Sequence, residues 1–304
     1  MTSLVTGAAG FLGRNLMAAL VQSGERVVAF GRADRRPSPS PGVTWVNADL
    51  NTFDHWETLL EDVSTVYHLA WSSLPHSANA DPSRDASTNI LTTLRLLEGL
   101  RSRPGVRFVF PSSGGTVYGR LDVVPVPEEH PTKPLTAYGI SKLTVENYLN
   151  FFGDAHGLDA VSLRISNLFG PGQAFGRGFG AIATLSAFAF RGEPIRIYGD
   201  GETVRDYIFV TDVVEAVLRA GRSSATSRLL NIGTGEGHSL NDIVNIVARY
   251  VDYPLKVNYE ARRPFDIPIS VLKIDRARNE LGWSPIVPFD EGVAQTILDV
   301  KSRL

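Results

Sequence analysis

Cysteine is absent from the 304 residues of this chain, which excludes disulfide bridges, thiolate catalysis and thiolate metal sites. The absence suits a reducing compartment. The six histidines include no pair at the spacing of metal ligands, so we expect no bound metal.

An excess of charge of one sign is also missing, because 30 Lys and Arg stand against 32 Asp and Glu, a formal net charge of −2. Such a balance gives no support for nucleic acid or an anionic membrane as a partner. No apolar run approaches the roughly 20 residues that a membrane-spanning helix needs. The first residues enter a strand pattern at once, from Ser3 to Thr6, without the basic and apolar regions of a signal peptide. We expect a cytoplasmic protein with no nucleic acid and no membrane among its partners.

What the sequence does have is an ordinary globular composition, 43% hydrophobic and 20% charged, with strand and helix patterns in alternation. Short, near-continuous apolar runs are typical of buried parallel strands, and helical patterns separate them. The strand patterns cover 3–6, 26–30, 43–49, 63–70, 106–110 and 160–165, and the helical ones 11–23, 89–100 and 138–152. This order predicts an α/β fold with a doubly wound parallel (Rossmann) sheet.

The texture changes after Asn167, where a glycine-rich loop runs to Gly180. Helices are expected near 181–191, 240–251 and 288–301, and strands near 196–198, 207–210 and 229–232. We predict a dinucleotide-binding domain over 1–168, with returns near 205–235. A smaller mixed α/β substrate-binding lobe over 169–304 would be interleaved with it.

Gly7, Gly10 and Gly13 follow the first strand and open the first helix, the context in which a glycine-rich turn binds a dinucleotide. Glycine permits a tight turn and the close approach of a pyrophosphate, whose charge then lies at the helix N-terminus. The spacing G-x-x-G-x-x-G differs from the G-x-G-x-x-G of many dehydrogenases.

The end of the second strand bears on the choice between NAD and NADP. An acidic residue there would accept the ribose hydroxyls of NAD, but this sequence has Gly31, then Arg32, Arg35 and Arg36. Because arginine binds phosphate in a bidentate manner, these residues favour the 2′-phosphate of NADP, whereas as plain loop charges they leave NAD open. Asp49 ends the third strand, where its carboxylate either meets the adenine amine or caps the loop.

The segment Thr136-Ala-Tyr138-Gly-Ile-Ser-Lys142 places a tyrosine and a lysine one helical turn apart on the same face. There the ammonium is expected to lower the pKa of the phenol from its usual value of about 10, making it a proton carrier near neutral pH. The spacing alone also fits an amphipathic helix with one solvated lysine. The glycine turn upstream favours the catalytic interpretation.

Taken in order, these motifs and several others resemble the extended short-chain dehydrogenase/reductase family, in particular its nucleotide-sugar epimerase/dehydratase group. The resemblance runs nearly end to end. The matching segments are Gly7-x-x-Gly-x-x-Gly13, His68-Leu-Ala70, Ser112-Ser-Gly-Gly-Thr-Val-Tyr-Gly119, Tyr138-x-x-x-Lys142, Arg164-Ile-Ser-Asn-Leu-Phe-Gly-Pro171, Gly199-Asp-Gly201, Arg205-Asp-Tyr-Ile-Phe-Val-Thr-Asp212, Asn231-Ile-Gly-Thr-Gly235, Arg263-Pro-Phe-Asp266 and Glu280-Leu-Gly-Trp283.

The resemblance implies NAD as the cofactor and a nucleotide sugar as the substrate. It implies that Tyr138 exchanges a proton with a sugar hydroxyl, while Lys142 lowers the pKa of Tyr138 and binds the nicotinamide ribose. Asn167, Arg205 and Arg263 match residues that bind the diphosphate of the nucleotide sugar, and two arginines can neutralise such a group. Cofactor contacts are expected from Gly7, Gly10, Phe11, Leu12, Gly13, Arg32, Asp49, Leu50, Leu69, Ala70, Asn89, Tyr138 and Lys142.

Asn89 matches an asparagine that opens a helix beside the active site of such proteins, although an N-cap is its local alternative. Related proteins pair this helix with the helix of Tyr138 across a two-fold axis. The resemblance therefore implies a homodimer.

Two positions depart from the family pattern. The catalytic serine or threonine usually lies four residues before the tyrosine of Val-Tyr-Gly, and Gly114 stands there. In an extended segment Ser112 and Thr116 would project to the same side as residue 114. We expect Thr116 to replace the missing hydroxyl, with Ser112 or Ser113 next. Trp71 stands where a small residue is common, and it either narrows the nicotinamide or sugar pocket or packs in the core.

The resemblance predicts a nucleotide-sugar 4-epimerase acting on a UDP-hexose, in which Tyr138 takes the proton of the 4-hydroxyl while carbon 4 passes a hydride to the nicotinamide. The resulting 4-keto sugar would turn over and receive the hydride on its other face. The alternative is an NADPH-dependent reductase of a nucleotide-linked 4-keto-6-deoxy sugar, which Gly31 and Arg32 favour. A dehydratase is disfavoured, because Gly115 and Thr116 stand where that chemistry needs an Asp-Glu pair. A redox-inert nucleotide-binding regulator is disfavoured because the tyrosine and the lysine are both present.

Overall fold

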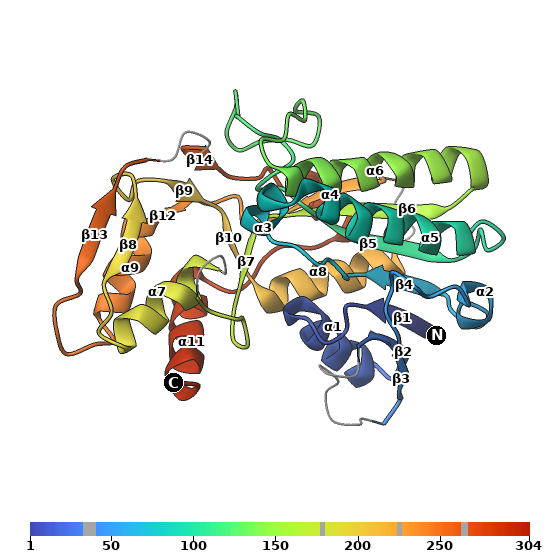
Figure 1. The fold of residues 1–304 in the computed structure, drawn as a ribbon, viewed down its shortest axis with the longest axis horizontal. Coiled ribbons are helices and arrows are strands. Elements are labelled where there is room, and N and C mark those ends of the chain that lie inside the picture. The colour runs from blue at the N-terminus through green and yellow to red at the C-terminus, as the bar shows by residue number, and fades with distance from the viewer. Residues whose placement is uncertain (33–40, 177–179, 224–226, 263–266) are drawn as a thin grey trace.

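The computed structural model describes residues 1–32, 41–176, 180–223, 227–262 and 267–304. Figure 1 shows a layered α/β body, with helices on both sides of a central sheet, and a smaller lobe beside it that carries the C-terminus. Arg35, Arg36 and Arg263, all named from the sequence, lie outside the described residues. Within the described ranges, every helix is too short or too polar to cross a membrane.

A seven-stranded sheet forms the centre of the body, in the order β11-β6-β5-β4-β1-β2-β3, and every neighbouring pair is parallel. Its strands are β1 (Thr2–Thr6), β2 (Arg26–Gly31), β3 (Val43–Asn47), β4 (Thr65–His68), β5 (Arg107–Ser113), β6 (Asp159–Ile165) and β11 (Leu229–Ile232). The order of connection reverses between β1 and β4, the place where such sheets bind ligands beyond the carboxyl ends of their strands. The predicted doubly wound Rossmann sheet is confirmed.

Helices cover both faces of this sheet, as the alternation of strands and helices requires. In Figure 1, α1 (Phe11–Gln22) and α8 (Val210–Arg222) lie on one face, and α5 (Leu91–Gly99) and α6 (Ala137–His156) on the other. Shorter segments are α2 (Trp56–Leu59), α3 (Pro75–Ala80), α4 (Pro82–Asp85) and the π-helical turn η2 (Ala86–Ile90). No helix was expected at α8, although Val210, Val213, Val214 and Val217 recur there at helical spacing and are buried.

The smaller lobe combines short sheets with α7 (Ala181–Phe190), α9 (Leu240–Ala248) and α11 (Phe289–Ser302). Its sheets pair β8 (Ile195–Tyr198) with β13 (Val257–Glu260), and β9 (Val204–Arg205) with β12 (His238–Ser239) and β14 (Ile269–Ser270). β7 (Asn167–Phe169) pairs with β10 (Tyr207–Phe209), and α10 (Asp275–Leu281) lies against β11. β11 thus returns the chain to the central sheet, and the domain boundary at 168 stays a prediction.

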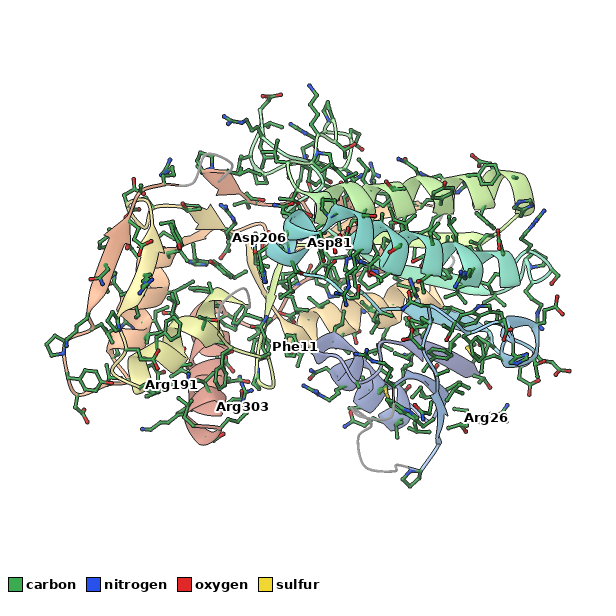
Figure 2. All side chains as sticks on the ribbon, in the orientation of Figure 1. Phe11, Arg26, Asp81, Arg191, Asp206 and Arg303 are labelled. Atoms are coloured by element: carbon green, nitrogen blue, oxygen red, sulfur yellow. The ribbon has the colours of Figure 1, made fainter. Side chains whose placement is uncertain are left out.

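Two hydrophobic clusters fill the two faces of the central sheet, and side chains occupy the space between the layers (Figure 2). One cluster includes Leu20 of α1 and Val217 of α8 and continues into the lobe as far as Ile243 of α9. The other includes Phe108 of β5 and Leu149 of α6. Because the first cluster is shared, the lobe is anchored to the body by packing rather than by a linker alone.

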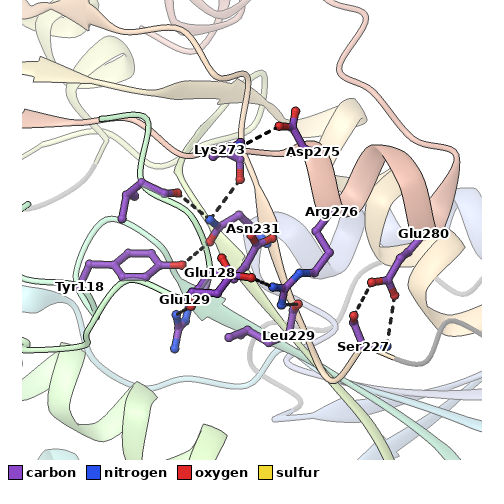
Figure 3. Close-up of polar contacts among 12 residues, drawn as sticks. Tyr118, Glu128, Glu129, Ser227, Leu229, Asn231, Lys273, Asp275, Arg276 and Glu280 are labelled. Atoms are coloured by element: carbon purple, nitrogen blue, oxygen red, sulfur yellow. Dashed lines mark hydrogen bonds and ion pairs between the residues drawn. The ribbon is translucent and has the colours of Figure 1, made fainter. Parts of the chain in front are cut away.

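A buried polar network fixes the loop that follows β5 (Figure 3). The Tyr118 hydroxyl donates to Asn231 Oδ1 at 2.6 Å, and Asn231 Nδ2 donates to the carbonyl oxygens of Val126 and Lys273 at 3.0 and 3.2 Å. The carboxylate of Glu128 accepts from the backbone nitrogen of Asn231 at 2.8 Å. Since Asn231 is fully buried on β11, these bonds tie the loop to the central sheet.

Candidate active site

The glycine turn after β1 leaves no room for a side chain at Gly7 or Gly13. Gly7 has a φ of 70°, and a Cβ there would lie 2.7 Å from the backbone nitrogen of Ala70. A Cβ at Gly13 would lie 2.3 Å from the carbonyl oxygen of Gly7. Gly10 is the N-cap of α1 and has no side chain to cover the free N–H groups of the first turn. Backbone donors at a positive helix end are what a pyrophosphate requires, so the turn fits a dinucleotide.

A pocket opens beside this turn, near the carboxyl ends of the first strands, and we call it the cofactor pocket. The predicted cofactor residues that line it are Gly7, Gly10, Arg32, Asp49, Leu50, Leu69, Ala70 and Asn89, while Phe11, Leu12 and Gly13 form the first turn of α1 directly after Gly10. The sequence missed Ala9, Phe30, Ala48, Asn51, Ser72, Thr88 and Thr92, which line it as well. Ala48 and Asn51 follow β3, and that position at a parallel sheet's carboxyl edge was a usable signal.

Two of the predicted cofactor residues are held by local hydrogen bonds. Asp49 Oδ1 accepts from the backbone nitrogen and the side chain of Asn51, each at 2.8 Å, so this carboxylate caps the loop and lines the pocket at once. Asn89 does not open a helix as expected, because the helical segment begins at Pro82 and Asn89 lies within the π-helical turn. Its Oδ1 accepts from the backbone nitrogen of Ser72 at 2.8 Å, which fixes the segment after β4.

His68, at the end of β4, is a buried neutral group. Its Nε2 lies 2.9 Å from the hydroxyl of Thr93, which itself donates to the carbonyl oxygen of Asn89 at 2.7 Å. Because that hydroxyl proton is already used, we assign the histidine proton to Nε2, and Nδ1 accepts from the Thr6 hydroxyl at 2.8 Å. Burial, and then the charge of Lys142, lowers the pKa of His68 to about 3.

The Lys142 ammonium lies beneath the ring of Trp71. Its Nζ is 3.8 Å from the centroid of that ring and 4.6 Å from the centroid of Phe110, and it donates to the carbonyl oxygen of Pro111 at 2.7 Å. Trp71 packs against Phe110 and also lines the cofactor pocket, so its packing role is observed, and a narrowing of the nicotinamide pocket stays a prediction.

The pKa shifts of the tyrosine and lysine differ from the expectation drawn from their spacing. Burial lowers the pKa of Lys142 to about 7, against the charges of Glu146 and Asp85, which raise it. Burial raises the pKa of Tyr138 above its usual value, and Asp85 raises it further. The prediction that Lys142 lowers the phenol pKa is therefore wrong. The ammonium faces Trp71 and a backbone carbonyl, 5.8 Å from the centroid of the Tyr138 ring.

A second pocket, which we call the substrate pocket, lies between the body and the smaller lobe. The predicted residues that line it are Ser113, Thr116, Tyr138, Asn167 and Arg205. The sequence missed Leu74, Pro75, Ser166, Gln173, Arg196, Tyr198, Thr203 and Leu240, which also line it. Ser166 lies inside the matching segment 164–171, which was a usable signal, whereas the others come from scattered segments that no local motif marks. The fold brings a phenol, hydroxyls and guanidinium groups to one cavity.

The segment after β5 is not extended as expected but turns at residues 114–116. Ser112, which lies before the turn, donates its hydroxyl to the carboxylate of Glu146, and Glu146 pairs with Arg164 at 2.7 Å. The structure therefore does not bring Ser112 into either pocket. A Cβ at Gly114 would lie 2.6 Å from Cδ1 of Leu272, so the space of the family's usual hydroxyl residue is already filled.

Ser113 and Thr116 remain as hydroxyl groups beside Tyr138. The Thr116 Oγ1 is buried, and among the described residues it has no hydrogen-bond partner. A buried hydroxyl without a partner costs roughly 1–3 kcal/mol, which a bound group that pairs with it would offset. Ser113 is the last residue of β5 and is half-buried.

The lobe side of the substrate pocket carries positive charge. Arg205 of β9 and Arg196 of β8 line it, and Arg196 lies 3.9 Å from the carboxylate of Glu260. Asn167 of β7 donates its backbone and side-chain N–H groups to the carbonyl oxygen of Asp206 at 2.9 and 3.1 Å. Hydroxyl groups at one end and guanidinium groups at the other suit a sugar joined to a diphosphate.

Comparison with known proteins agrees with a site for a dinucleotide and a nucleotide sugar. Residues 3–233 match the NAD dependent epimerase/dehydratase family. The chain is 35% identical over 305 residues to a UDP-glucose 4-epimerase of Mycolicibacterium smegmatis, a match that covers 98% of this chain and 97% of that protein. It is 31% identical over 315 residues to a dTDP-4-dehydro-6-deoxyglucose reductase of Escherichia coli, covering 99% of this chain and 98% of that protein.

A solved structure agrees with these relatives. The UDP-glucose 4-epimerase of Thermotoga maritima with UDP-glucose has a TM-score of 0.93 and 33% identity, covering 100% of this chain and 99% of that one. The family match spans most of the chain, the relatives span nearly all of it, and the resemblance drawn from the motifs is confirmed. The chain therefore belongs to the NAD dependent epimerase/dehydratase family, of the extended short-chain dehydrogenase/reductase type.

Proposed function

We propose that this protein is a nucleotide-sugar 4-epimerase, an isomerase that acts on a UDP-hexose through a transient 4-keto sugar. The observation that carries the proposal is the position of Tyr138 in the substrate pocket beside Ser113 and Thr116. One helical turn on, Lys142 lies against Trp71 of the cofactor pocket. The relatives support this function, because UDP-glucose 4-epimerases match the chain end to end.

In this proposal Tyr138 exchanges a proton with the 4-hydroxyl of the sugar. Its raised pKa makes the phenolate a strong base and the phenol a stable proton store between the two half-reactions. Thr116 and Ser113 hydrogen-bond to the 4-oxygen, and Lys142 binds the nicotinamide ribose. When held in the cofactor pocket, nicotinamide dinucleotide would supply a reversible hydride acceptor, and the positive charge of its oxidised form would favour the phenolate form of Tyr138.

The diphosphate binds at the lobe side of the substrate pocket. Arg205 and Arg196 supply positive charge, and Asn167 lies on the strand between them and the body. Arg263, expected from the sequence to share this role, lies outside the described residues. Anchoring through the diphosphate leaves the hexose ring free to turn over between hydride removal and return.

We propose NAD as the cofactor. The family is described as NAD dependent, and the glycine turn has the cradle that a dinucleotide needs. Gly31 and Arg32 line the cofactor pocket, but no finding supports the preference for NADP that they suggested. Mass spectrometry of the dinucleotide released from denatured protein is expected to show NAD, and NADP would contradict the proposal.

The decisive assay is interconversion of UDP-glucose and UDP-galactose by purified protein without added reductant. An epimerase recycles its cofactor, so turnover is expected to continue at catalytic amounts of NAD. The alternative, an NADPH-dependent reductase of a nucleotide-linked 4-keto-6-deoxy sugar, is favoured by the Escherichia coli relative. Stoichiometric loss of the reduced-nicotinamide absorbance with such a keto sugar, and no interconversion, would select the reductase.

A homodimer is proposed as well. The outer faces of α5 and α6 expose Leu91, Ile140, Tyr148 and Phe151, an apolar surface that a second copy of the chain would cover. Size-exclusion chromatography with mass measurement is expected to give a dimer for the native chain and a monomer for Ile140→Lys. A monomeric native protein would reject the proposal. The cytoplasmic location stays a prediction.

A further inference from the structure

A buried carboxylate next to both pockets was not predicted from the sequence. Asp85 ends α4 and is only 2% exposed. Ser73 and Asn89 donate to its Oδ1, the latter at 2.8 Å, and Ser141 donates to its Oδ2. A buried charge is costly unless its hydrogen bonds are made, so this carboxylate fixes the positions of its three donors closely.

Each donor belongs to a different part of the proposed active site. Ser73 lies in the segment 71–75, whose residues line both the cofactor pocket and the substrate pocket. Asn89 lines the cofactor pocket. Ser141 is in α6, directly before Lys142. Asp85 therefore joins the walls of both pockets to the helix that carries the tyrosine and the lysine.

The charge of Asp85 also reaches that pair. After burial, it is the cause that raises the pKa of Tyr138. It also raises the pKa of Lys142, together with Glu146 and against the larger effect of burial. In both groups the negative charge favours the protonated form.

Other charged or titratable groups face the pair from the elements packed around it. Glu146, one turn after Lys142 on α6, pairs with Arg164 of β6 at 2.7 Å. His68 of β4 is held neutral by burial and by its neighbours. Asp85 differs from Glu146 because its hydrogen-bond donors are uncharged side chains, so no guanidinium offsets its charge through those contacts.

We propose that Asp85 is a positioning residue for the epimerase reaction, which holds segment 71–75 against α6 and places a fixed negative charge beside Tyr138 and Lys142. The inference rests on the proposed function, because turnover is its main readout.

Asp85→Asn tests the charge with little change in shape. We expect kcat to fall about tenfold or more, with KM for UDP-glucose within about threefold. Both limbs of the pH profile of kcat should move to lower pH by about one unit, because removing a negative charge lowers the pKa of both the tyrosine and the lysine. Calorimetric affinity for NAD, which needs no turnover, should fall about threefold as Asn89 and segment 71–75 lose their anchor.

Two control variants separate charge from structure. Asp81→Asn makes the same change four residues earlier, where an exposed carboxylate caps α4 by accepting from the backbone nitrogen of Arg84 at 2.9 Å (Figure 2). It should leave kcat and the pH profile unchanged, since asparagine caps as well as aspartate. Ser141→Ala removes one hydrogen bond to Asp85 but keeps the negative charge of its carboxylate. We therefore expect kcat to fall about threefold while both limbs of the pH profile of kcat stay where they are.

The outcomes separate this inference from the proposed function. A native protein without interconversion rejects the function, and the NAD affinity of Asp85→Asn then decides the positioning role, with an unchanged affinity overturning it. If the native protein is active, two results overturn the inference alone. One is an unchanged kcat in Asp85→Asn, and the other is a lower kcat with a pH profile that has not moved. If Asp85→Asn does not fold, the Ser73→Ala, Ser141→Ala double variant replaces it, and unchanged kcat and NAD affinity there overturn the proposal.

Discussion

The two pockets that adjoin the Tyr138–Lys142 helix are built in different ways. The cofactor pocket is lined mainly by short segments that follow β1, β2, β3 and β4, together with Thr88, Asn89 and Thr92, and the glycines of the turn contribute backbone alone. The substrate pocket collects residues from 74–75, 113–116, 138, 166–173, 180–182, 196–207 and 240, on both the body and the lobe. Its lining includes Arg196 and Arg205.

This difference indicates which part of the molecule determines cofactor binding and which part determines substrate binding. Binding of a dinucleotide depends on strand ends and a helix N-terminus, which the fold itself provides. In the proposed function, the sugar nucleotide is held in part by side chains of the lobe, which the fold does not dictate. Changes in the lobe are therefore expected to alter substrate binding without altering cofactor binding.

The largest effect is expected where the two pockets adjoin. Tyr138→Phe removes the proton carrier, so kcat should fall about 10³-fold in the interconversion assay, with unfolding temperature and NAD affinity unchanged. Tyr148→Phe removes the hydroxyl of another tyrosine of α6, on the outer face that the proposed dimer would cover, and should leave kcat unchanged. Full activity of Tyr138→Phe would point to a nucleotide-binding protein rather than an enzyme.

Arg205→Ala should separate the two pockets. Loss of one charge-assisted contact to the diphosphate is expected to raise KM for UDP-glucose about 30-fold, or about 2 kcal/mol, with kcat and NAD affinity little changed. Arg191, at the exposed end of α7, gives the matched control Arg191→Ala, for which both constants should stay the same. An equal loss of NAD affinity in Arg205→Ala would contradict the separation.

Gly114→Ser examines the turn that replaces the family's usual hydroxyl residue. The new Cβ meets Leu272, so we expect a loss of about 1–3 kcal/mol in the free energy of unfolding, measured by urea denaturation. Leu272→Ala opens that space at its own cost. The double variant should be more stable than the sum of the two single losses predicts, by about 1 kcal/mol. Strict additivity would show that Leu272 is not what excludes a side chain at 114.

The same contrast between the two pockets explains which site residues could be predicted from the sequence. Gly7, Gly10 and Ala70 are marked by local motifs, because the cofactor pocket is made of segments contiguous with strand ends. Leu74 and Leu240 lie in the substrate pocket for reasons of tertiary packing alone, and no local pattern could have indicated them.

Electrostatic surroundings were harder to predict than location. The spacing of Tyr138 and Lys142 placed both on one face of a helix, but it did not reveal that burial and Asp85 raise the phenol pKa. In a segment treated as extended, Ser112 projected to the same side as Thr116 and ranked after it as a replacement hydroxyl. The turn at 114–116 and the pairing of Ser112 with Glu146 made them different.

Beneath the cofactor pocket, His68 predicts a pH effect on stability. The pKa of His68 in the folded state is about 3, below its unfolded value. Its contribution to the free energy of unfolding is therefore complete above about pH 6.5 and is lost as pH falls toward 3. The loss is up to about 1.4 kcal/mol per pH unit. His68→Asn should therefore flatten the pH dependence of the free energy of unfolding between about pH 6 and 5, whereas His55→Asn, at a side chain that is 81% exposed, should not. Equal slopes in the native chain and His68→Asn would contradict the assignment of a buried neutral imidazole.

The smallest effect is expected at Arg32, a cationic side chain in the lining of the cofactor pocket. NAD has no 2′-phosphate, so Arg32→Ala should change calorimetric NAD affinity less than about threefold, whereas any NADP affinity should fall about tenfold with the lost phosphate contact. Arg26→Ala is the matched control, because Arg26 is exposed at the opposite end of β2 (Figure 2). A large loss of NAD affinity in Arg32→Ala but not in Arg26→Ala would mean that the cofactor pocket also depends on a side chain. The contrast between a pocket made by the fold and a pocket made by side chains would then no longer hold.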